Sequence, residues 1–477
     1  MDDGSQPAAD ARHVSSEPVG GPGAPLRRIL GPVSVACVGV GVAIGSGIFA
    51  TPGEAAKHLH SPGALLSIWV VAGFVTLLQS FVTAELATRF PRAGGEYQFL
   101  REAYGDFAAF FFGWSFTIFI VGGGAGTIAA AFGEFIAELL VMDQPWSAPL
   151  FGCAAIAAVT TVNALGLRTG AVTQNLLTFL KTSAVVAIAV GALLMARRAV
   201  PAAQAAAPTG GATLESYLLA LLPAFWSYSG ANDSAKLAEE TRDVNRALPR
   251  ALLATVTVLT AVYCFYNYAL LCAARPDQMA GVRSVPAMIF APLTGYPVNE
   301  MILIASALVC LGALSSTFLA NIRVTYAMAR DGLTFRALGR MSAKQAPVAS
   351  LVVGAVLACA FVVNRRFEDI LRIYFLASAL LFGLTYASMI VFRLRDRREG
   401  RAFPSNVFRT PFGMAVAGLL IVIELAIGAS IISSDLRTGS RDSLMTLALL
   451  TALAVLYVVW KAVVARFAGA DHSGGRR

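Results

Sequence analysis

Long apolar segments joined by short polar connections fill this chain from about residue 30 to residue 465. A transmembrane helix needs about 20 mostly apolar residues, and twelve segments reach that length. They begin near Pro32, Pro62, Gly105, Ala148, Thr169, Leu214, Leu248, Val298, Val348, Ile370, Phe412 and Ser443. The pattern therefore predicts an all-α polytopic membrane protein with twelve transmembrane helices.

Two of these segments are interrupted where a spanning helix should be most regular. The first contains Gly45-Ser46-Gly47 near its middle, and the sixth breaks at SYSGAND, residues 227–233. A broken helix in hydrocarbon leaves backbone N–H and C=O groups without partners, unless protein, water or a ligand supplies them. The glycines alone are also compatible with close helix packing. Two interrupted segments five spans apart are instead typical of a secondary transporter with the leucine-transporter fold.

The composition supports a membrane protein and excludes several functional classes. The chain is 57% hydrophobic and 14% charged, whereas a soluble domain carries about a quarter charged residues. Its net charge of +9 is spread over short connections rather than one basic face, so nucleic-acid binding is not indicated. No Walker loop is present, which argues against ATP-driven transport by this chain alone. No connection is long enough for a catalytic domain, and the six cysteines and four histidines form no metal motif. We therefore expect neither an enzyme nor a cofactor.

Charge bias predicts the orientation in the cytoplasmic membrane. Basic residues concentrate in one alternate set of connections, most strongly in RLRDRREGR at 393–401, so the positive-inside rule places both termini in the cytoplasm. Residues 1–26, rich in Pro, Gly, Ala and Asp, are expected to form a disordered cytoplasmic tail, and 467–477 a second tail. The apolar connection 281–296 is expected to form a re-entrant or interfacial helix on the outer side.

Five motifs resemble those of the amino acid–polyamine–organocation (APC) superfamily, in particular its L-type amino acid transporter and basic amino acid/polyamine antiporter branches. They are GVAIGSGIFATPG (41–53), AELATRFPRAGGEYQFLREAYG (84–105), FWSYSGAND (225–233), EETRDVNRALPRA (239–251) and ARDGLTFRALGRMSAKQAPVASL (329–351). The resemblance implies a leucine-transporter-like 5+5 inverted repeat. Its first repeat would span 27–196 and its second 214–395, with helices 1 and 6 discontinuous and two accessory helices in 410–466.

The two breaks are the expected substrate site. The half-helix after Gly45 offers free N–H groups and a positive dipole end to a carboxylate. Open carbonyls at Ile44, Trp226, Ser227 and Ser229 would receive an ammonium. The resemblance extends this role to a set of residues on both breaks: Gly45, Ser46, Gly47, Ile48, Trp226, Ser227, Tyr228, Ser229 and Gly230.

The same resemblance gives Trp226 a possible gating role over bound substrate, although an aromatic beside a break is also compatible with ordinary packing. Asn232 corresponds to a polar position that lines the pocket. Asp233 either faces the site, where it would favour a cationic side chain, or faces water and caps the second half of the helix. The sequence leaves both alternatives open.

Lys181, a lone charge in the body of the fifth segment, is the candidate coupling residue. A lysine inside a membrane span is a functional-site hypothesis by default. It matches the lysine that sodium-independent superfamily members carry where sodium-coupled relatives bind the ion. Its ammonium would connect the opened backbone of helix 1 to the hydroxyls of Ser315 and Ser316. The alternative is snorkelling toward the cytoplasm. An exchanger would keep the lysine charged, whereas a proton symporter would discharge it, and both remain open.

Four acidic residues, Glu85, Glu134, Glu138 and Glu424, are further candidates for proton traffic, and Arg323 is expected to pair with one of them or to face the inner vestibule.

Animal L-type light chains bind a glycoprotein through a cysteine between helices 3 and 4. The corresponding connection here, 141–148, has no cysteine, so we expect no disulfide-linked heavy chain. The sequence thus predicts a sodium-independent amino acid transporter. A polyamine or other amine permease is the alternative, and a non-transporting sensor or a channel is less favoured.

Overall fold

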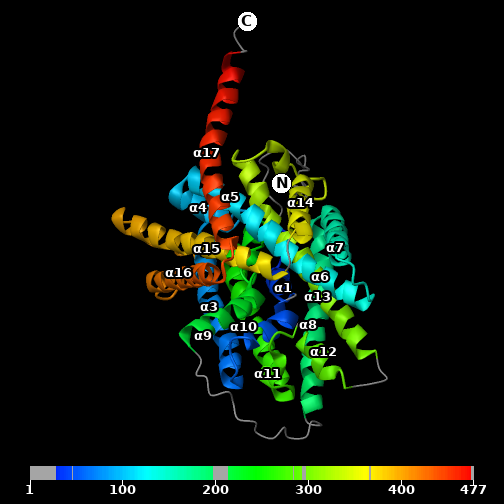
Figure 1. Cartoon of the computed structure of the whole chain (residues 1–477). Helices are drawn as coiled ribbons and strands as arrows, with labels where there is room; N and C mark the ends of the chain where they lie inside the picture. The colour runs from blue at the N-terminus through cyan, green and yellow to red at the C-terminus, as the bar shows by residue number, and fades with distance from the viewer. Residues whose placement is uncertain are drawn as a thin grey trace, which may run out of the picture.

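The computed structural model describes residues 28–45, 47–196, 213–282, 284–292, 297–364 and 367–473. These residues form helices and connections, with one isolated β-bridge between Leu30 and Thr241 and no strand among them (Figure 1). The all-α class predicted from the apolar segments is therefore confirmed. The expected disordered tail at 1–26 lies outside the described residues.

Nine helices in the described part of the chain are long and apolar enough to cross a membrane. They are α3 (Pro62–Arg89), the continuous run α5–η1–α6 (Asp106–Ser115, Phe116–Gly124 and Ala125–Leu139), α7 (Ser147–Ala164), α8 (Leu167–Ala196), α10 (Val244–Ala273), α13 (Val298–Arg330), α15 (Phe367–Arg398), α16 (Gly413–Thr438) and α17 (Asp442–Ser473). They correspond to nine of the twelve predicted segments. The protein is thus a multi-pass membrane protein.

The three remaining predicted segments are the two interrupted ones and a short one. The first segment forms α1 (Pro32–Ala43) and α2 (Gly47–Ala56), and the sixth forms α9 (Leu214–Tyr228) and η2 (Asp233–Glu240). The first interruption falls at Gly45 to Gly47 and the second within 227–233, as the sequence predicted. The ninth forms α14 (Val348–Asn364), which has 17 residues.

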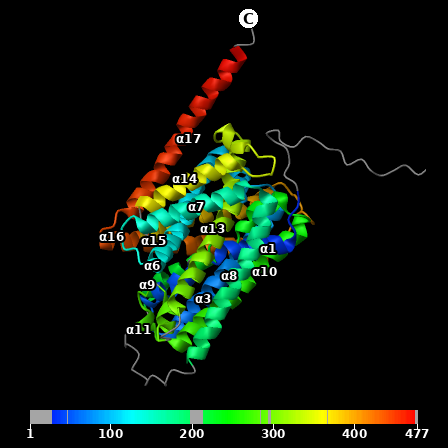
Figure 2. The same ribbon diagram turned by 90° about the vertical axis from the view of Figure 1, so that its right-hand side faces the viewer.

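Glycines allow close crossings around the third segment. Its middle, η1, is a π-helix that ends in Gly122-Gly123-Gly124, and α14 packs against η1 and α6. A Cβ on Gly122 would lie 3.0 Å from Leu357 Cβ, and one on Gly126 would lie 2.9 Å from Phe361 Cβ. Helix α14 therefore crosses the third segment closely at these glycines. Helices α7 and α14 lie side by side in both views (Figure 2).

Short helices complete the structure. Helix α4 (Glu96–Tyr104) is amphipathic and precedes the third segment, and the other short helices are α11 (Pro276–Met279), α12 (Val285–Phe290) and η3 (Arg336–Gly339). Within the expected interfacial segment 281–296, the described helix is α12, which packs against α2, α8 and α13. Helix α17 continues to Ser473, so most of the expected C-terminal tail prolongs this helix beyond the others (Figure 1).

Candidate functional site

The two helix breaks lie against each other. Helix α2 packs on α9, and a Cβ on Gly47 would lie 2.8 Å from Trp226 Cδ1 and 3.0 Å from Ser227 Oγ. Thr51 Oγ1 lies 3.0 Å from Ser227 Oγ, which adds a polar contact between the half-helices. Gly47 is therefore the residue that allows the N-terminus of α2 to approach α9. Ser46, expected in the same site, lies outside the described residues.

Tyr263 of α10, which no sequence motif marks, joins the two breaks. The Tyr263 hydroxyl of α10 lies 3.0 Å from the Ala43 carbonyl and 2.7 Å from the Ser227 carbonyl. These carbonyls end the two interrupted helices, so their intrahelical partners are missing. The Trp226 carbonyl accepts a hydrogen bond from Ser229 N, 3.0 Å away. Two of the carbonyls expected for an ammonium, Trp226 and Ser227, therefore have protein partners here, and nothing local in the sequence marked Tyr263.

A first cavity opens between the breaks and encloses about 430 Å³, its mouth included. The expected site residues that line it are Gly45, Gly47, Trp226, Ser229 and Gly230. Ile44 and Ile48 instead lie in the hydrophobic core without lining it. The remaining wall comes from α1, η1, α6, η2, α13 and α15. The cavity therefore joins residues from both halves of the chain.

A second, larger cavity lies behind the first, between α3, α15, α16 and the break in the sixth segment. It encloses about 800 Å³ including its mouth, and the expected residues Tyr228 and Asn232 line it. Ser80 Oγ donates a hydrogen bond to Asn232 Oδ1 at 2.6 Å. The residues that line both cavities are Ser229, Gly230, Asp233 and Tyr374.

Trp226 and Tyr374 form the aromatic part of the wall between the cavities. Their rings meet edge to face with centroids 5.0 Å apart, and the Tyr374 hydroxyl lies 2.5 Å from Ser229 Oγ. Phe375 also contacts Trp226, with centroids 6.3 Å apart. Trp226 thus lies at the cavity as the gating hypothesis requires, held by α15 on one side.

Asp233 belongs to a buried charged cluster. Its Oδ1 lies 2.6 Å from Lys236 Nζ, and its Oδ2 accepts a hydrogen bond from Asn321 Nδ2 at 2.7 Å. The same ammonium lies 3.3 Å from Glu96 Oε2 and 5.0 Å from the centre of the Phe116 ring. Burial raises the pKa of the Glu96 carboxyl, and the Lys236 charge opposes that shift. Of the two alternatives for Asp233, the structure favours the one in which it faces the site.

Lys236 and Glu96 were not among the expected site residues, although a lysine inside an interrupted apolar segment is itself a signal of a functional site. Lys236 is fully buried, and it shares its positive charge between two carboxylates on different elements. A buried charge is tolerated only with such partners. The cluster connects η2, α4 and α13 at one side of the cavities.

Lys181 of α8 is buried and donates a hydrogen bond to the carbonyl of Gly41 on α1. The structure therefore excludes snorkelling and agrees with the expected contact to the opened helix. No described hydrogen bond joins Lys181 to Ser315 or Ser316. Ser316 Oγ donates to the Gly312 carbonyl at 2.9 Å, and Ser315 Oγ lies 3.5 Å from Asn163 Nδ2. Helix α13 nevertheless packs closely here, since a Cβ on Gly312 would lie 3.5 Å from Lys181 Nζ.

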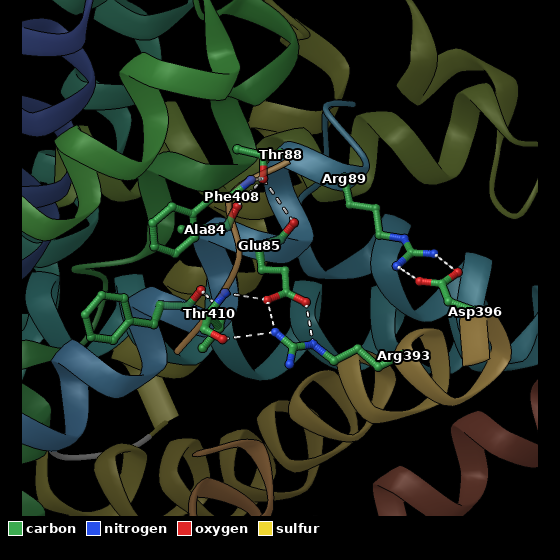
Figure 3. A network of polar contacts seen from close by, with 9 residues as sticks. Ala84, Glu85, Thr88, Arg89, Arg393, Asp396, Phe408 and Thr410 are labelled. Carbon is green, nitrogen blue, oxygen red and sulfur yellow. Dashed lines mark hydrogen bonds and ion pairs between the residues drawn. The ribbon is translucent and has the colours of Figure 1, made fainter. Parts of the chain in front are cut away.

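Glu85, one of the four candidate proton carriers, lies in a polar network at the end of α3. Arg393 of α15 donates to both carboxylate oxygens, at 2.9 and 2.6 Å, and Thr410 N donates at 2.7 Å (Figure 3). One turn further, Arg89 makes a two-pronged contact with Asp396 at 2.7 and 2.8 Å. Figure 3 shows both arginines reaching across from one helix to an acid on the other. Glu85 is thus a structural anchor between α3, α15 and the connection before α16.

The other candidate acids differ in their surroundings. Glu424 of α16 is buried and lines the larger cavity, Glu134 is half-buried, and Glu138 is exposed near the end of α6. Arg323 of α13 pairs with Glu240 of η2, its Nε 3.2 Å from Oε1. Of the two alternatives for Arg323, the structure contradicts pairing with one of the four candidate acids, because its partner is Glu240 at the end of the sixth segment.

Residues 30–459 match the family model described as amino acid permease. The chain belongs to this family. The permease is 28% identical to the mouse (Mus musculus) b(0,+)-type amino acid transporter 1 over 403 residues, which cover 83% of this chain and 82% of the relative. It is 26% identical to the human (Homo sapiens) large neutral amino acids transporter small subunit 2, over 85% and 77% of the two chains. It is 24% identical to the serine/threonine exchanger SteT of Bacillus subtilis (strain 168), over 87% and 93%. The resemblance to the APC superfamily is confirmed.

Proposed function

We propose that this permease is a secondary transporter that moves an amino acid across the cytoplasmic membrane by alternating access. The observation that carries the proposal is the cavity between the two helix breaks, lined by Gly45 and Gly47 on one side and by Trp226, Ser229 and Gly230 on the other. An amino acid must bury a carboxylate and an ammonium together, and each unpaired charge would cost several kcal/mol.

The geometry supports opposite roles for the two breaks. The N-terminus of α2, a helix of 10 residues, presents backbone N–H groups and a positive dipole end to a carboxylate. Each charge-assisted hydrogen bond there is worth roughly 1.5–3 kcal/mol. The carbonyls of Ile44 and Ser229 remain the candidates for the ammonium. The relatives are named for amino acids, which favours an amino acid over a polyamine or a sensing role without transport.

We propose further that the chain has twelve spans in two inverted five-helix repeats, 27–196 and 214–395, followed by two accessory helices. The nine apolar helices, the two interrupted pairs and α14 are compatible with that number. The distribution of basic residues over the connections predicts that both termini lie in the cytoplasm. The absence of cysteine from 141–148 argues against a disulfide-linked heavy chain.

Sodium independence rests on Lys181. Its ammonium donates a hydrogen bond to the Gly41 carbonyl. A fixed cation therefore already binds a backbone carbonyl that the break in the first segment leaves without an intrahelical partner. The permease then works as an exchanger or as a proton symporter. Exchange requires substrate on the far side, whereas symport requires an inward proton gradient.

The test is transport by the purified full chain in liposomes, screened with labelled amino acids and polyamines in sodium and in choline buffers. We expect uptake of at least one amino acid at equal rates in both buffers. Uptake that requires external sodium would contradict the proposed coupling. Uptake of polyamines alone would contradict the proposed substrate.

A further inference from the structure

The larger cavity continues from the proposed amino acid site. The two cavities share Ser229, Gly230, Asp233 and Tyr374, so a molecule bound at the breaks borders on both. The far wall is formed by α3, α15 and α16, and its polar groups include Thr76, Gln79, Ser378, Thr385 and Tyr386. The space is therefore placed and lined to take the side chain of a substrate whose backbone groups lie in the smaller cavity.

Glu424 of α16 is a buried acid in this wall. The residue is 7% exposed, and the polar contact described for its carboxylate is Gln79 Nε2 at 3.5 Å. That distance lies at the limit of a hydrogen bond. An ionised carboxylate held in such a site without a partner is strongly disfavoured. A bound cation would supply the missing partner.

The remaining charges of the wall do not supply it. The other ionisable acids that line the cavity are Glu96 and Asp233, and both are held by Lys236 from outside the cavity. No Lys or Arg is among the residues described as lining it. The described lining of the cavity therefore contains acids and no basic side chain, and Glu424 is the acid in it without a cationic partner.

We propose that this cavity receives the cationic end of a substrate side chain, with Glu424 as its counter-ion, so that the permease prefers amino acids with a basic side chain. This inference rests on the proposed function. The substrate's carboxylate and ammonium lie at the two breaks, and its side chain passes the wall formed by Tyr374 and Ser229. A neutral side chain of the same shape fills the same space and leaves Glu424 unpaired.

Arginine and citrulline provide the test, because they differ little in shape while only arginine is charged. Their transport by the full-length permease in liposomes is compared for the wild type, Glu424→Gln and Glu424→Asp. Glu300→Gln is the matched control, since Glu300 is exposed on α13 and lines neither cavity. We expect the wild type to have a KM for arginine about tenfold or more below that for citrulline. A hydrogen bond to a charged group contributes roughly 1.5–3 kcal/mol, which corresponds to a difference of this size. Glu424→Gln should remove most of this difference by raising the arginine KM, and Glu424→Asp should retain part of it.

Three results would overturn the inference. They are equal KM values for arginine and citrulline in the wild type, an arginine KM that Glu424→Gln leaves unchanged, and a loss that is equal for both substrates. The last would assign Glu424 to the transport cycle, for example to proton movement. Each leaves the proposed function intact when neutral amino acids are transported.

If a variant does not fold, the inference is tested on the wild type alone. The measurement is the change in Tm of the detergent-solubilised protein when arginine or citrulline is added. A ligand that binds only the folded state stabilises it by RT ln(1 + [L]/Kd), so at equal concentration the ligand with the lower Kd raises Tm more. Arginine should raise Tm at concentrations where citrulline does not. A protein stabilised by neither, and transporting no amino acid, would contradict the proposed function itself.

Discussion

The ammonium of Lys181 donates a hydrogen bond to the carbonyl of Gly41, in the last turn of α1 before the break. The carbonyls of a last helical turn have no intrahelical partner, so a residue from α8 satisfies one that the break exposes. A Cβ on Gly41 would lie 2.7 Å from Thr178 Oγ1 and 2.9 Å from Ser316 Oγ. The contact between α1, α8 and α13 therefore depends both on a lysine and on a glycine without a side chain.

Replacement of this lysine is the first prediction. Lys181→Ala should lose most transport, because the Gly41 carbonyl is left without a cation, while stability should fall less because water can enter a polar site. Uptake in liposomes and thermal unfolding measure the two effects. Lys461→Ala, on the exposed face of α17, is the control. Near-normal uptake by Lys181→Ala would remove the residue from the coupling mechanism.

A valine at Gly47 should abolish substrate binding. Its Cβ would meet Trp226 and Ser227 at 2.8 and 3.0 Å, and its bulk would fill the space in front of the N-terminus of α2. Gly418→Val on α16 is the matched control, since no atom lies within 4 Å of a Cβ there. Ligand-induced thermal stabilisation measures binding in both variants. Normal binding by a well-folded Gly47→Val protein would place the site elsewhere.

Trp226→Ala should raise the apparent KM or slow turnover, because it removes the ring that packs on Tyr374 and Phe375 at the wall between the cavities. Trp226→Phe should retain more activity, since it keeps an aromatic contact. Initial uptake rates over a range of substrate concentrations separate the two parameters. Kinetics unchanged in Trp226→Ala would assign the tryptophan to packing alone.

Lys236→Met should destabilise the folded protein by roughly 3–5 kcal/mol, because it leaves Asp233 and Glu96 buried without a cation. Adding Glu96→Gln to this variant should restore part of the loss, since one of the two uncompensated acids is removed. Chemical unfolding in detergent measures the difference. Lys461→Met, at an exposed position, should change little. Equal stability of Lys236→Met and the wild type would show that the cluster contributes nothing to folding.

Arg393→Ala should destabilise the packing of α3 against α15, by about 3 kcal/mol if Glu85 loses its bidentate partner in a largely buried site. Arg398→Ala, exposed near the end of the same helix, is the control. Thermal unfolding of the two variants measures the effect. If both behave alike, the network in Figure 3 is not a stabilising anchor.

The positions of the spans and of both breaks could be predicted from the sequence. A span is recognised by the length of its apolar run, and a break by Gly45 and Gly47 or by Ser227 to Asp233 within such a run. Both signals are local, because every backbone polar group in hydrocarbon must find its partner nearby. Lys181 is marked by its charge inside an apolar span, and the family resemblance adds the coupling role of Lys181 and the gating role of Trp226.

Pairing between distant residues was decided only by the tertiary structure. Lys236 meets Glu96, Arg323 meets Glu240, and Tyr263 reaches the carbonyls of both breaks. Such contacts depend on the rotation of each helix about its axis and on the point where it crosses its neighbour. A helix surrounded by lipid and other helices is apolar on most of its faces, so its apolar periodicity determines neither the rotation nor the crossing point. The sequence by itself therefore determined where helices span and where they break. Packing alone decided which buried charges pair, and that Glu424 is left facing a cavity.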